Sequence, residues 1–267
     1  MGLRGLKWEY SYTVLLITWM GWISIYLARS VLPPVLPILA EELGFTYTQS
    51  GLLETAYLIG YIVIKMPAGA LSNRFGARKV LAASMVGYGT ATFLVSGAQG
   101  FTDIFVLRLL VGLFQGVHLP VANALLSDRF GHRQSRAIGF NESGANIGNT
   151  LAFPITVTIA SSLGWRYAFM FLSLPAFLLS VATFTLMKEE KPAPPEADAK
   201  PNGRLRDYAW VLAPFALSHG VYNLVLLGLT LYSFSPIIYS STTQSLPSEY
   251  KSLGLGAVTM FGNIVGA

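Results

Sequence analysis

The stretch that decides the fold is residues 65–79, which read KMPAGALSNRFGARK. Residues 50–66 are almost wholly apolar, and residues 80–101 contain no charged side chain. A short basic turn between two apolar runs is typical of a cytoplasmic loop in a membrane protein, because Lys and Arg are retained on the inner side. We therefore predict that residues 65–79 join two membrane spans on the inner side, with Gly69 and Gly76 allowing a tight connection.

The composition places the whole chain in the membrane class. Hydrophobic residues make up 53% of 267 and charged residues 12%, against about 25% charged in soluble domains, and the mean hydropathy is +0.53. The predicted fold class is therefore an all-α polytopic membrane protein. The chain has no cysteine, which excludes disulfides and thiolate metal sites.

The net charge of +5 is explained by topology, because most Lys and Arg residues fall in predicted inner-side segments, and we expect no nucleic-acid partner. The sequence shows no nucleophile–base pair, phosphate-binding loop or metal-ligand cluster, so we predict neither an enzyme nor a cofactor.

Six apolar runs precede a break in the pattern. We predict spans at residues 12–40, 48–68, 80–96, 104–126, 137–159 and 167–187. Arg4 and Lys7 place the N-terminus in the cytoplasm of a multi-pass protein of the plasma or inner membrane. We thus expect a six-helix bundle over residues 1–187, a Pro-rich charged linker over 188–207, and a partial second bundle of about two spans over 208–267.

The basic loop resembles the signature between the second and third helices of the major facilitator superfamily. The residues that carry the resemblance are Gly69, Leu71, Asn73, Arg74, Gly76, Arg78 and Lys79. The family usually has an aspartate where this chain has Asn73, which puts the charge-based latch between the two halves in doubt. The resemblance implies a conformational role for this loop. It also implies that the C-terminal half is truncated or internally shortened, because residues 247–264 resemble the family's tenth-to-eleventh helix region.

Two further patterns resemble the organophosphate:phosphate antiporter branch, and less closely the anion:cation symporters. They are formed by Tyr26, Arg29 and Pro37 in the first span and by Tyr61, Lys65 and Gly69 in the second. The resemblance implies that Arg29 is the principal ligand of the substrate anion and that Lys65 assists it. An arginine fork binds phosphate or carboxylate in a bidentate manner.

The residues themselves leave alternatives open for these cations. Tyr26 and Arg29 share a helix face, and a cation at this depth normally faces a polar cavity. Arg29 could instead neutralise Glu54, which lies at a similar depth. Lys65 shares a face with Glu54, eleven residues earlier, but is predicted about one turn from the inner end and could snorkel to it.

The fourth span carries a packing motif and two polar candidates. Arg108, Gly112 and Gly116 are spaced by four residues, which allows close helix approach and resembles the superfamily's fourth-helix motif. Gln115 and His118 follow the outline of the antiporter branch. His118 titrates near neutral pH and could couple a proton to transport, although a single histidine in a span is more often a packing residue.

The fifth span has a polar face that includes Glu142 and Asn146. Glu142 is a second candidate for ion coupling, although it could equally face cytoplasmic water. The histidine of glycerol-phosphate-type antiporters would fall at Ala145, and its absence argues against that substrate.

The resemblance implies a secondary transporter of a small organic anion, an organophosphate or a carboxylate, working by alternating access. Its expected partners are the anionic solute, a coupling ion (proton, sodium or counter-anion) and the lipid bilayer, and no oligomeric state is assigned. The residues expected to contact substrate are Arg29, Tyr26, Lys65, Glu54, Gln115, His118 and Asn146. The alternative is a non-transporting fragment or sensor paralogue; a proton-driven drug exporter is disfavoured because spans 1 and 2 carry deep cations.

Overall fold

A computed structural model describes residues 9–189, 210, 212–214, 217 and 218. Nearly all of the predicted partial bundle and of the predicted linker therefore lies outside the described residues, as do Arg4 and Lys7. The described part forms eight α-helices and a short 3-10 helix. These are α1 (Tyr10–Arg29), α2 (Leu32–Leu43), α3 (Tyr47–Phe75), α4 (Ala77–Val95), α5 (Phe101–Gln115), α6 (His118–Phe130), η1 (Gly131–Arg133), α7 (Gln134–Leu163) and α8 (Trp165–Leu186).

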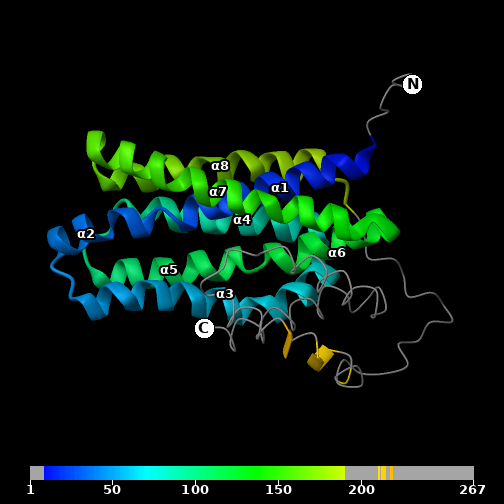
Figure 1. The fold of residues 1–267 in the computed structure, drawn as a ribbon, viewed down its shortest axis with the longest axis horizontal. Coiled ribbons are helices and arrows are strands. Elements are labelled where there is room, and N and C mark those ends of the chain that lie inside the picture. Colours follow the sequence, from blue (N-terminus) through cyan, green and yellow to red (C-terminus); the bar gives the residue numbers. More distant parts are fainter. Residues whose placement is uncertain (1–8, 190–209, 211, 215–216, 219–267) are drawn as a thin grey trace.

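The helices run back and forth along the long axis of the bundle (Figure 1). The start of α1 and the whole of α6 lie at one end, whereas α2 lies at the other. The most extensive helix contacts join α3 to α5, α4 to α8 and α1 to α7. Four stretches of the described chain have the length and apolarity of membrane spans: Tyr10–Leu43, Thr48–Phe75, Phe101–Leu163 and Trp165–Leu186.

Two predicted spans are interrupted, and prolines explain why. The span predicted over residues 12–40 breaks between α1 and α2, where Pro33 and Pro34 lack the N–H groups that would bond the carbonyls of Arg29 and Ser30. The span predicted over 104–126 breaks between α5 and α6, where Pro120 cannot bond the carbonyl of Gly116. Each break frees backbone carbonyls inside the bundle.

The prediction of a loop over residues 65–79 is wrong in extent. Helix α3 continues to Phe75 and α4 begins at Ala77, so Gly76 alone connects them, with a φ of 89° that favours glycine. Gly69, Asn73 and Arg74 are consequently helical. The polar composition indicated the inner end of the spans, but nothing within residues 68–75 stops a helix.

Two apolar clusters fill the interior, and charged residues lie between them. One cluster includes Ile25, Tyr57 and Val111, and the other includes Val31, Leu53 and Ile104. On α3 and α5 an ionic residue falls between a member of one cluster and a member of the other, and on α1 the ionic residue is the last one, between Ile25 and Val31 in the sequence. These ionic residues are Arg29 on α1, Glu54 on α3 and Arg108 on α5.

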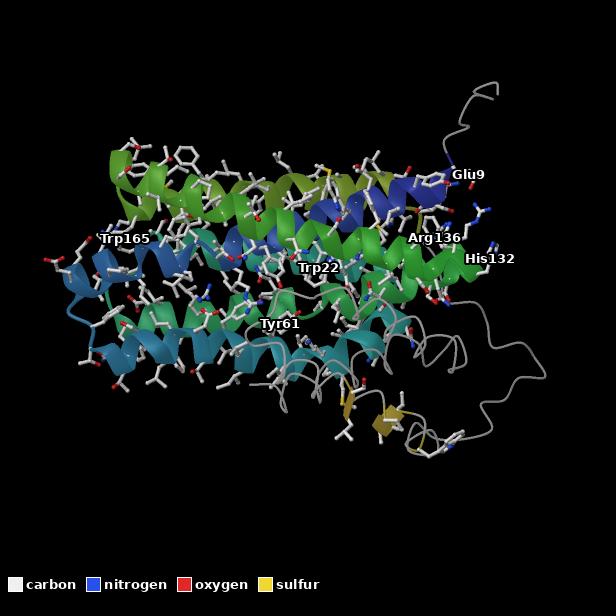
Figure 2. The ribbon with its side chains drawn as sticks, in the orientation of Figure 1. Glu9, Trp22, Tyr61, His132, Arg136 and Trp165 are labelled. Atoms are coloured by element: carbon white, nitrogen blue, oxygen red, sulfur yellow. The ribbon has the colours of Figure 1, made fainter. Side chains whose placement is uncertain are left out.

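Side chains confirm the arrangement along the axis. Figure 2 shows Trp22 and Tyr61 midway along the bundle, Glu9, His132 and Arg136 at one end, and Trp165 near the other.

Candidate functional site: an ionic cluster between three helices

Arg29 ends α1 at the helix break and is partly accessible. Its side chain is 28% exposed, and its guanidinium carbon lies 4.7 Å from the ring centroid of Tyr57 and 5.5 Å from that of Tyr26. Two aromatic faces stabilise a cation whose water has been partly removed. The geometry therefore presents a charged fork at mid-bundle with part of its surface free to meet a ligand.

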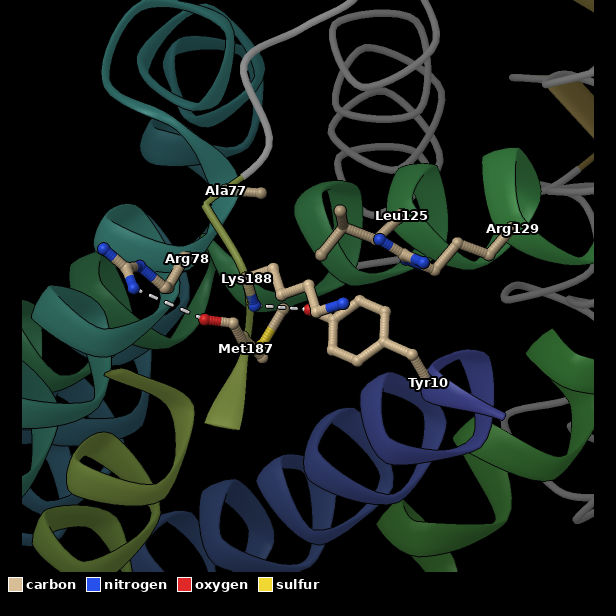
Figure 3. A pocket seen from close by; sticks show the side chains of 7 residues that line it. All are labelled: Tyr10, Ala77, Arg78, Leu125, Arg129, Met187 and Lys188. Carbon is tan, nitrogen blue, oxygen red and sulfur yellow. Dashed lines mark hydrogen bonds between the residues drawn. The ribbon is translucent and has the colours of Figure 1, made fainter. Parts of the chain in front are cut away.

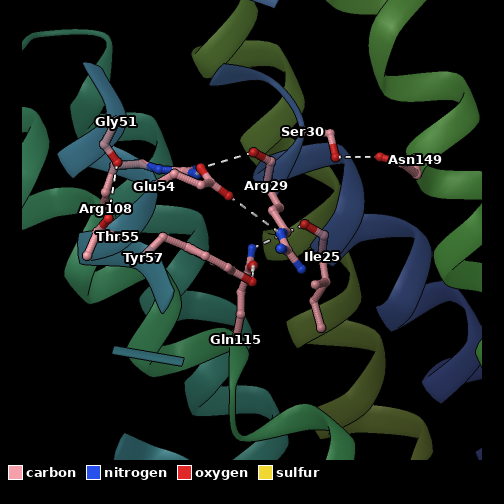
Figure 4. A network of polar contacts seen from close by, with 10 residues as sticks. All are labelled: Ile25, Arg29, Ser30, Gly51, Glu54, Thr55, Tyr57, Arg108, Gln115 and Asn149. Carbon is pink, nitrogen blue, oxygen red and sulfur yellow. Dashed lines mark hydrogen bonds and ion pairs between the residues drawn. The ribbon is translucent and has the colours of Figure 1, made fainter. Parts of the chain in front are cut away.

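Glu54 lies between two arginines (Figure 4). Its Oε2 is 2.5 Å from Nη2 of Arg108, and its Oε1 is 3.9 Å from Nε of Arg29. The prediction that Arg29 neutralises Glu54 thus identified only the more distant partner. The closer one, Arg108, is buried with 1% of its side chain exposed, and so depends on this carboxylate for compensation.

Arg108 also gives a hydrogen-bond partner to a backbone carbonyl at the helix break. Its Nη1 donates to the carbonyl of Arg29 at 3.3 Å, the carbonyl that Pro33 leaves without a helical partner. Arg108 therefore links α5 to both α1 and α3, beyond the packing role predicted for it.

A second set of polar contacts adjoins the cluster. The hydroxyl of Tyr57 donates to Oε1 of Gln115 at 3.0 Å, and Nε2 of Gln115 donates to the carbonyl of Ile25 at 3.2 Å. All three side chains are buried. Gln115, predicted to contact substrate, therefore lies behind Tyr57 and fixes the ring on which both guanidiniums rest.

Lys65 lies deeper than predicted. It precedes the end of α3 by ten residues, and its side chain is buried with Nζ 4.4 Å from the ring centroid of Tyr61. Snorkelling to the inner end is therefore not what this structure shows. Tyr61 stacks on Tyr57 with ring centroids 5.7 Å apart, so stacked tyrosines separate Lys65 from Arg29.

His118 lies in the bundle interior, away from the ionic cluster. Its Nε2 is 3.0 Å from the carbonyl of Thr18, which requires the proton on that nitrogen, and its ring meets Trp22 edge-on at 5.1 Å. A Cβ at Gly21 would collide with this ring. The placement favours the packing interpretation of His118.

The polar face of α7 flanks the helix break. The hydroxyl of Ser30 donates to Oδ1 of Asn149 at 2.8 Å (Figure 4). Asn146 is exposed one turn away, and Glu142 is partly buried a further turn toward the start of α7. A neutral amide group of α7 therefore bonds Ser30, the residue that follows Arg29 at the helix break.

Glycines bring α5 against α3, as the spacing of Gly112 and Gly116 indicated. A Cβ at Gly112 would strike the carbonyl of Tyr57, and one at Gly116 would strike that of Tyr61. The close approach is what allows Arg108 to reach Glu54 across the interface.

The remaining residues of the basic motif form contacts at the end of the bundle. Oε2 of Glu189 lies 2.7 Å from Arg78, and its Oε1 lies 2.5 Å from Lys79. The hydrogen bond from Lys79, with Arg78 adding to it, holds the pKa of Glu189 below its ordinary value. Asn73 and Arg74 are exposed on the last turns of α3. These contacts tie the start of α4 to the end of α8.

A small pocket opens at the same end around Tyr10 (Figure 3). The hydroxyl of Tyr10 accepts a hydrogen bond from the backbone N–H of Lys188 at 2.5 Å. Arg129 and Lys188 lie over its ring at 4.4 and 5.0 Å. Arg78 completes the basic lining. The pocket is lined by none of the residues of the ionic cluster, so it is a separate feature.

Sequence reasoning missed two members of the central site. Tyr57 and the ionic role of Arg108 carried no signal of their own, since a tyrosine in a span and an arginine in a glycine motif are each explained by packing. The sequence signal that could have predicted the pair was that Arg108 and Glu54 fall at similar membrane depths in their predicted spans.

Comparison with known proteins places these features in context. A family model described as Major Facilitator Superfamily matches residues 18–266. A hexuronate transporter of Bacillus subtilis strain 168 is 28% identical over 178 residues, which are 66% of this chain and 42% of that protein. A D-galactonate transporter of Escherichia coli O6:H1 strain CFT073 is 26% identical over 160 residues, which are 60% of this chain and 37% of that protein.

Solved structures agree on the fold. A bacterial homologue of the human lysosomal transporter Spinster, inward-facing and unoccupied, matches with a TM-score of 0.66 at 17% sequence identity. The match covers 98% of this chain and 60% of that chain. This chain spans less than half the length of the two relatives named above.

Proposed function

Because the chain belongs to the Major Facilitator Superfamily, we propose that its ionic cluster binds a small organic anion in the course of secondary transport. The membership confirms the predictions of a multi-pass membrane protein of transporter type and of a protein that is not an enzyme. Transport by alternating access, with the remainder of the chain moving against this bundle, is part of the proposal.

The observation that carries the proposal is the exposed part of Arg29. A guanidinium at mid-bundle is retained in spans chiefly for function or pairing. Arg108 already has a close ionic partner, whereas Arg29 is 3.9 Å from its nearest carboxylate oxygen and 28% exposed. Arg29 is therefore the cation that an entering anion can reach.

The neighbouring groups favour a hydroxylated carboxylate. Ser30 and Asn149, which bond each other at the helix break after Arg29, and Asn146 one turn earlier on α7 offer neutral donors and acceptors, which suits hydroxyl groups better than a second charge. Proteins similar to this chain carry hexuronate and D-galactonate by name. We propose a sugar acid, with an organophosphate as the less favoured alternative.

Coupling and orientation complete the proposal. We propose a proton as the coupling ion, and Glu142 rather than His118 as its carrier, because His118 is enclosed against Trp22. Basic residues cluster where α6 meets α7, namely Arg129, His132, Arg133 and Arg136. We place that end, and with it the N-terminus, in the cytoplasm of a plasma or inner membrane.

The test is thermal stability of the purified chain in detergent with a panel of hexuronates, aldonates, sugar phosphates and inorganic phosphate. A ligand that binds only the folded state stabilises it by about 2.7 kcal/mol at a hundredfold excess over its Kd, and so raises the melting temperature. We expect the largest shift with a hexuronate, and its loss in Arg29→Lys, since a lysine cannot form the bidentate pair.

The matched control is Arg136→Lys, which makes the same replacement at an exposed position on α7. It should keep the full shift. A hexuronate shift that survives in Arg29→Lys would refute Arg29 as the anchor. The absence of a shift with any anion would favour the non-transporting alternative.

A further inference from the structure

We infer that Glu54 tunes the charge selectivity of the site, because its negative charge weakens the binding of an anion with two negative charges more than the binding of an anion with one. The inference rests on the proposed role of Arg29 and concerns a residue that does not itself contact the anion. The feature that carries it is the sharing of one carboxylate by two arginines.

The three ionic residues Arg29, Glu54 and Arg108, here called the triad, are unequally spaced. Glu54 forms a close pair with Arg108, which is enclosed, and lies farther from Arg29, which is partly open. An anion at Arg29 therefore approaches with the carboxylate of Glu54 as its nearest fixed negative charge. Glu54 is itself 40% exposed.

The charges of the triad sum to one positive charge, from two guanidiniums and one carboxylate. The ionic partners of Glu54 are Arg29 from α1 and Arg108 from α5. The titratable groups nearest to Arg29 are the hydroxyls of Tyr26, Tyr57 and Tyr61. Lys65, eleven residues along α3 from Glu54, is buried over the ring of Tyr61 and is a further cation that acts on Arg29.

A second negative charge on the ligand changes its Coulomb energy with the charges of the triad. Coulomb energy scales with the product of the charges, so any fixed charge acts twice as strongly on a dianion as on a monoanion at the same place. Removing the negative charge of Glu54 should therefore raise the affinity of a monoanion by some factor and that of a dianion by about the square of it. The charge of Lys65 does not alter this ratio.

The experiment compares glucuronate, a monoanion, with glucarate, which has the same carbon skeleton and a second carboxylate. Affinities are measured by titration calorimetry on the purified chain in detergent at neutral pH. The wild-type ratio of the two affinities is the reference. In Glu54→Gln we expect affinity to rise about tenfold for glucuronate and about a hundredfold for glucarate, so that the ratio shifts about tenfold toward glucarate.

Two further variants test charge separately from folding. Arg108→Gln should act in the opposite direction, weakening glucarate by about the square of its effect on glucuronate. The double variant Glu54→Gln with Arg108→Gln restores a sum of one positive charge and should return the ratio of the two affinities close to its wild-type value. These two decide the question if Glu54→Gln does not fold. Glu41→Gln, an exposed carboxylate on α2, is the control and should change neither affinity.

The outcomes separate this inference from the proposal beneath it. If Arg29→Lys abolishes glucuronate binding while the charge variants change both ligands by the same factor, the selectivity role of Glu54 is wrong and the anchor role of Arg29 stands. If Arg29→Lys leaves glucuronate binding intact, or the wild type binds neither acid, both are wrong.

Discussion

At the level of single residues, burial separates two arginines that are chemically identical. Arg108 has lost its water and is held by Glu54 and by the carbonyl of Arg29. Arg29 keeps part of its surface open and rests on two tyrosine rings. One guanidinium thus supports the structure, and the other is the one that we propose as the anion anchor.

Replacing His118 tests whether this residue has a packing role rather than a coupling role. His118→Ala should lower the free energy of unfolding by about 2 kcal/mol, because it removes a buried ring that packs on Trp22. It should leave the pH dependence of hexuronate binding unchanged. Stability is measured by denaturant unfolding in detergent, and pH dependence by calorimetry. A change in the number of protons taken up with the ligand would instead make His118 a coupling group.

At this scale the sequence predicted Arg29 and Glu54 as neighbours because both are charges in otherwise apolar spans. It could not predict that Arg108 competes for the same carboxylate. Which of two cations pairs more closely depends on the rotation of α3 and α5 about their axes, and that is decided by the glycine contacts between them.

At the level of helices, the two breaks and the close α3–α5 contact act together. The proline-induced break after Arg29 frees a carbonyl, and Arg108 from α5 satisfies it. Gly112 and Gly116 allow α5 to approach α3 closely enough for that reach. The ionic cluster therefore depends on backbone features of three helices.

Gly112→Ala tests the helix contact. The added methyl group meets the backbone carbonyl of Tyr57, which cannot move without displacing α3. We expect a loss of about 2 kcal/mol in unfolding free energy together with weaker hexuronate binding. The matched control is Gly97→Ala, where the nearest atom to the added Cβ is 3.7 Å away, and it should be close to neutral. Equal stability of the two variants would contradict the close packing.

The contact between α4 and the end of α8 should depend on pH. The pKa of Glu189 is lowered in the folded state by Lys79 and Arg78, so its stabilisation is complete above the ordinary carboxyl pKa. It is lost as the pH falls through the lowered pKa. The difference in melting temperature between wild type and Glu189→Gln should be present at neutral pH and vanish in acid. A difference that persists in strong acid would rule out an ionic origin.

Helix positions were largely predictable because an uncharged apolar run long enough to cross a bilayer is rarely anything but a helix. The breaks were not, because proline is tolerated within membrane helices and α3, α7 and α8 continue through Pro67, Pro154 and Pro175. The extent of α3 was also missed, because a basic sequence marks the membrane boundary rather than the end of a helix.

At the level of the whole molecule, the alternating helices place α6 and the start of α1 at one end and α2 at the other (Figure 1). Glu42, in the last turns of α2, pairs with Arg166 at the start of α8, and the indole N–H of Trp165 donates to it at 2.6 Å. Contacts at both ends thus hold the described bundle together around the central ionic cluster.

The orientation can be tested directly because the chain has no cysteine of its own. Single replacements Glu41→Cys and His132→Cys lie at opposite ends and are exposed. In intact cells, a membrane-impermeant maleimide should label Glu41→Cys and should label His132→Cys only after permeabilisation. The reverse pattern would invert the proposed orientation.

The proposed role of Arg29 can be tested by modification of arginines with phenylglyoxal, with and without saturating glucuronate, followed by mass spectrometry of the peptides. Arg29 should react in the free protein and be protected by glucuronate. Arg108, which is buried, should remain unmodified in both samples, and Arg136 should react equally in both. Modification of Arg29 to the same extent with and without glucuronate would contradict its role as the anion anchor.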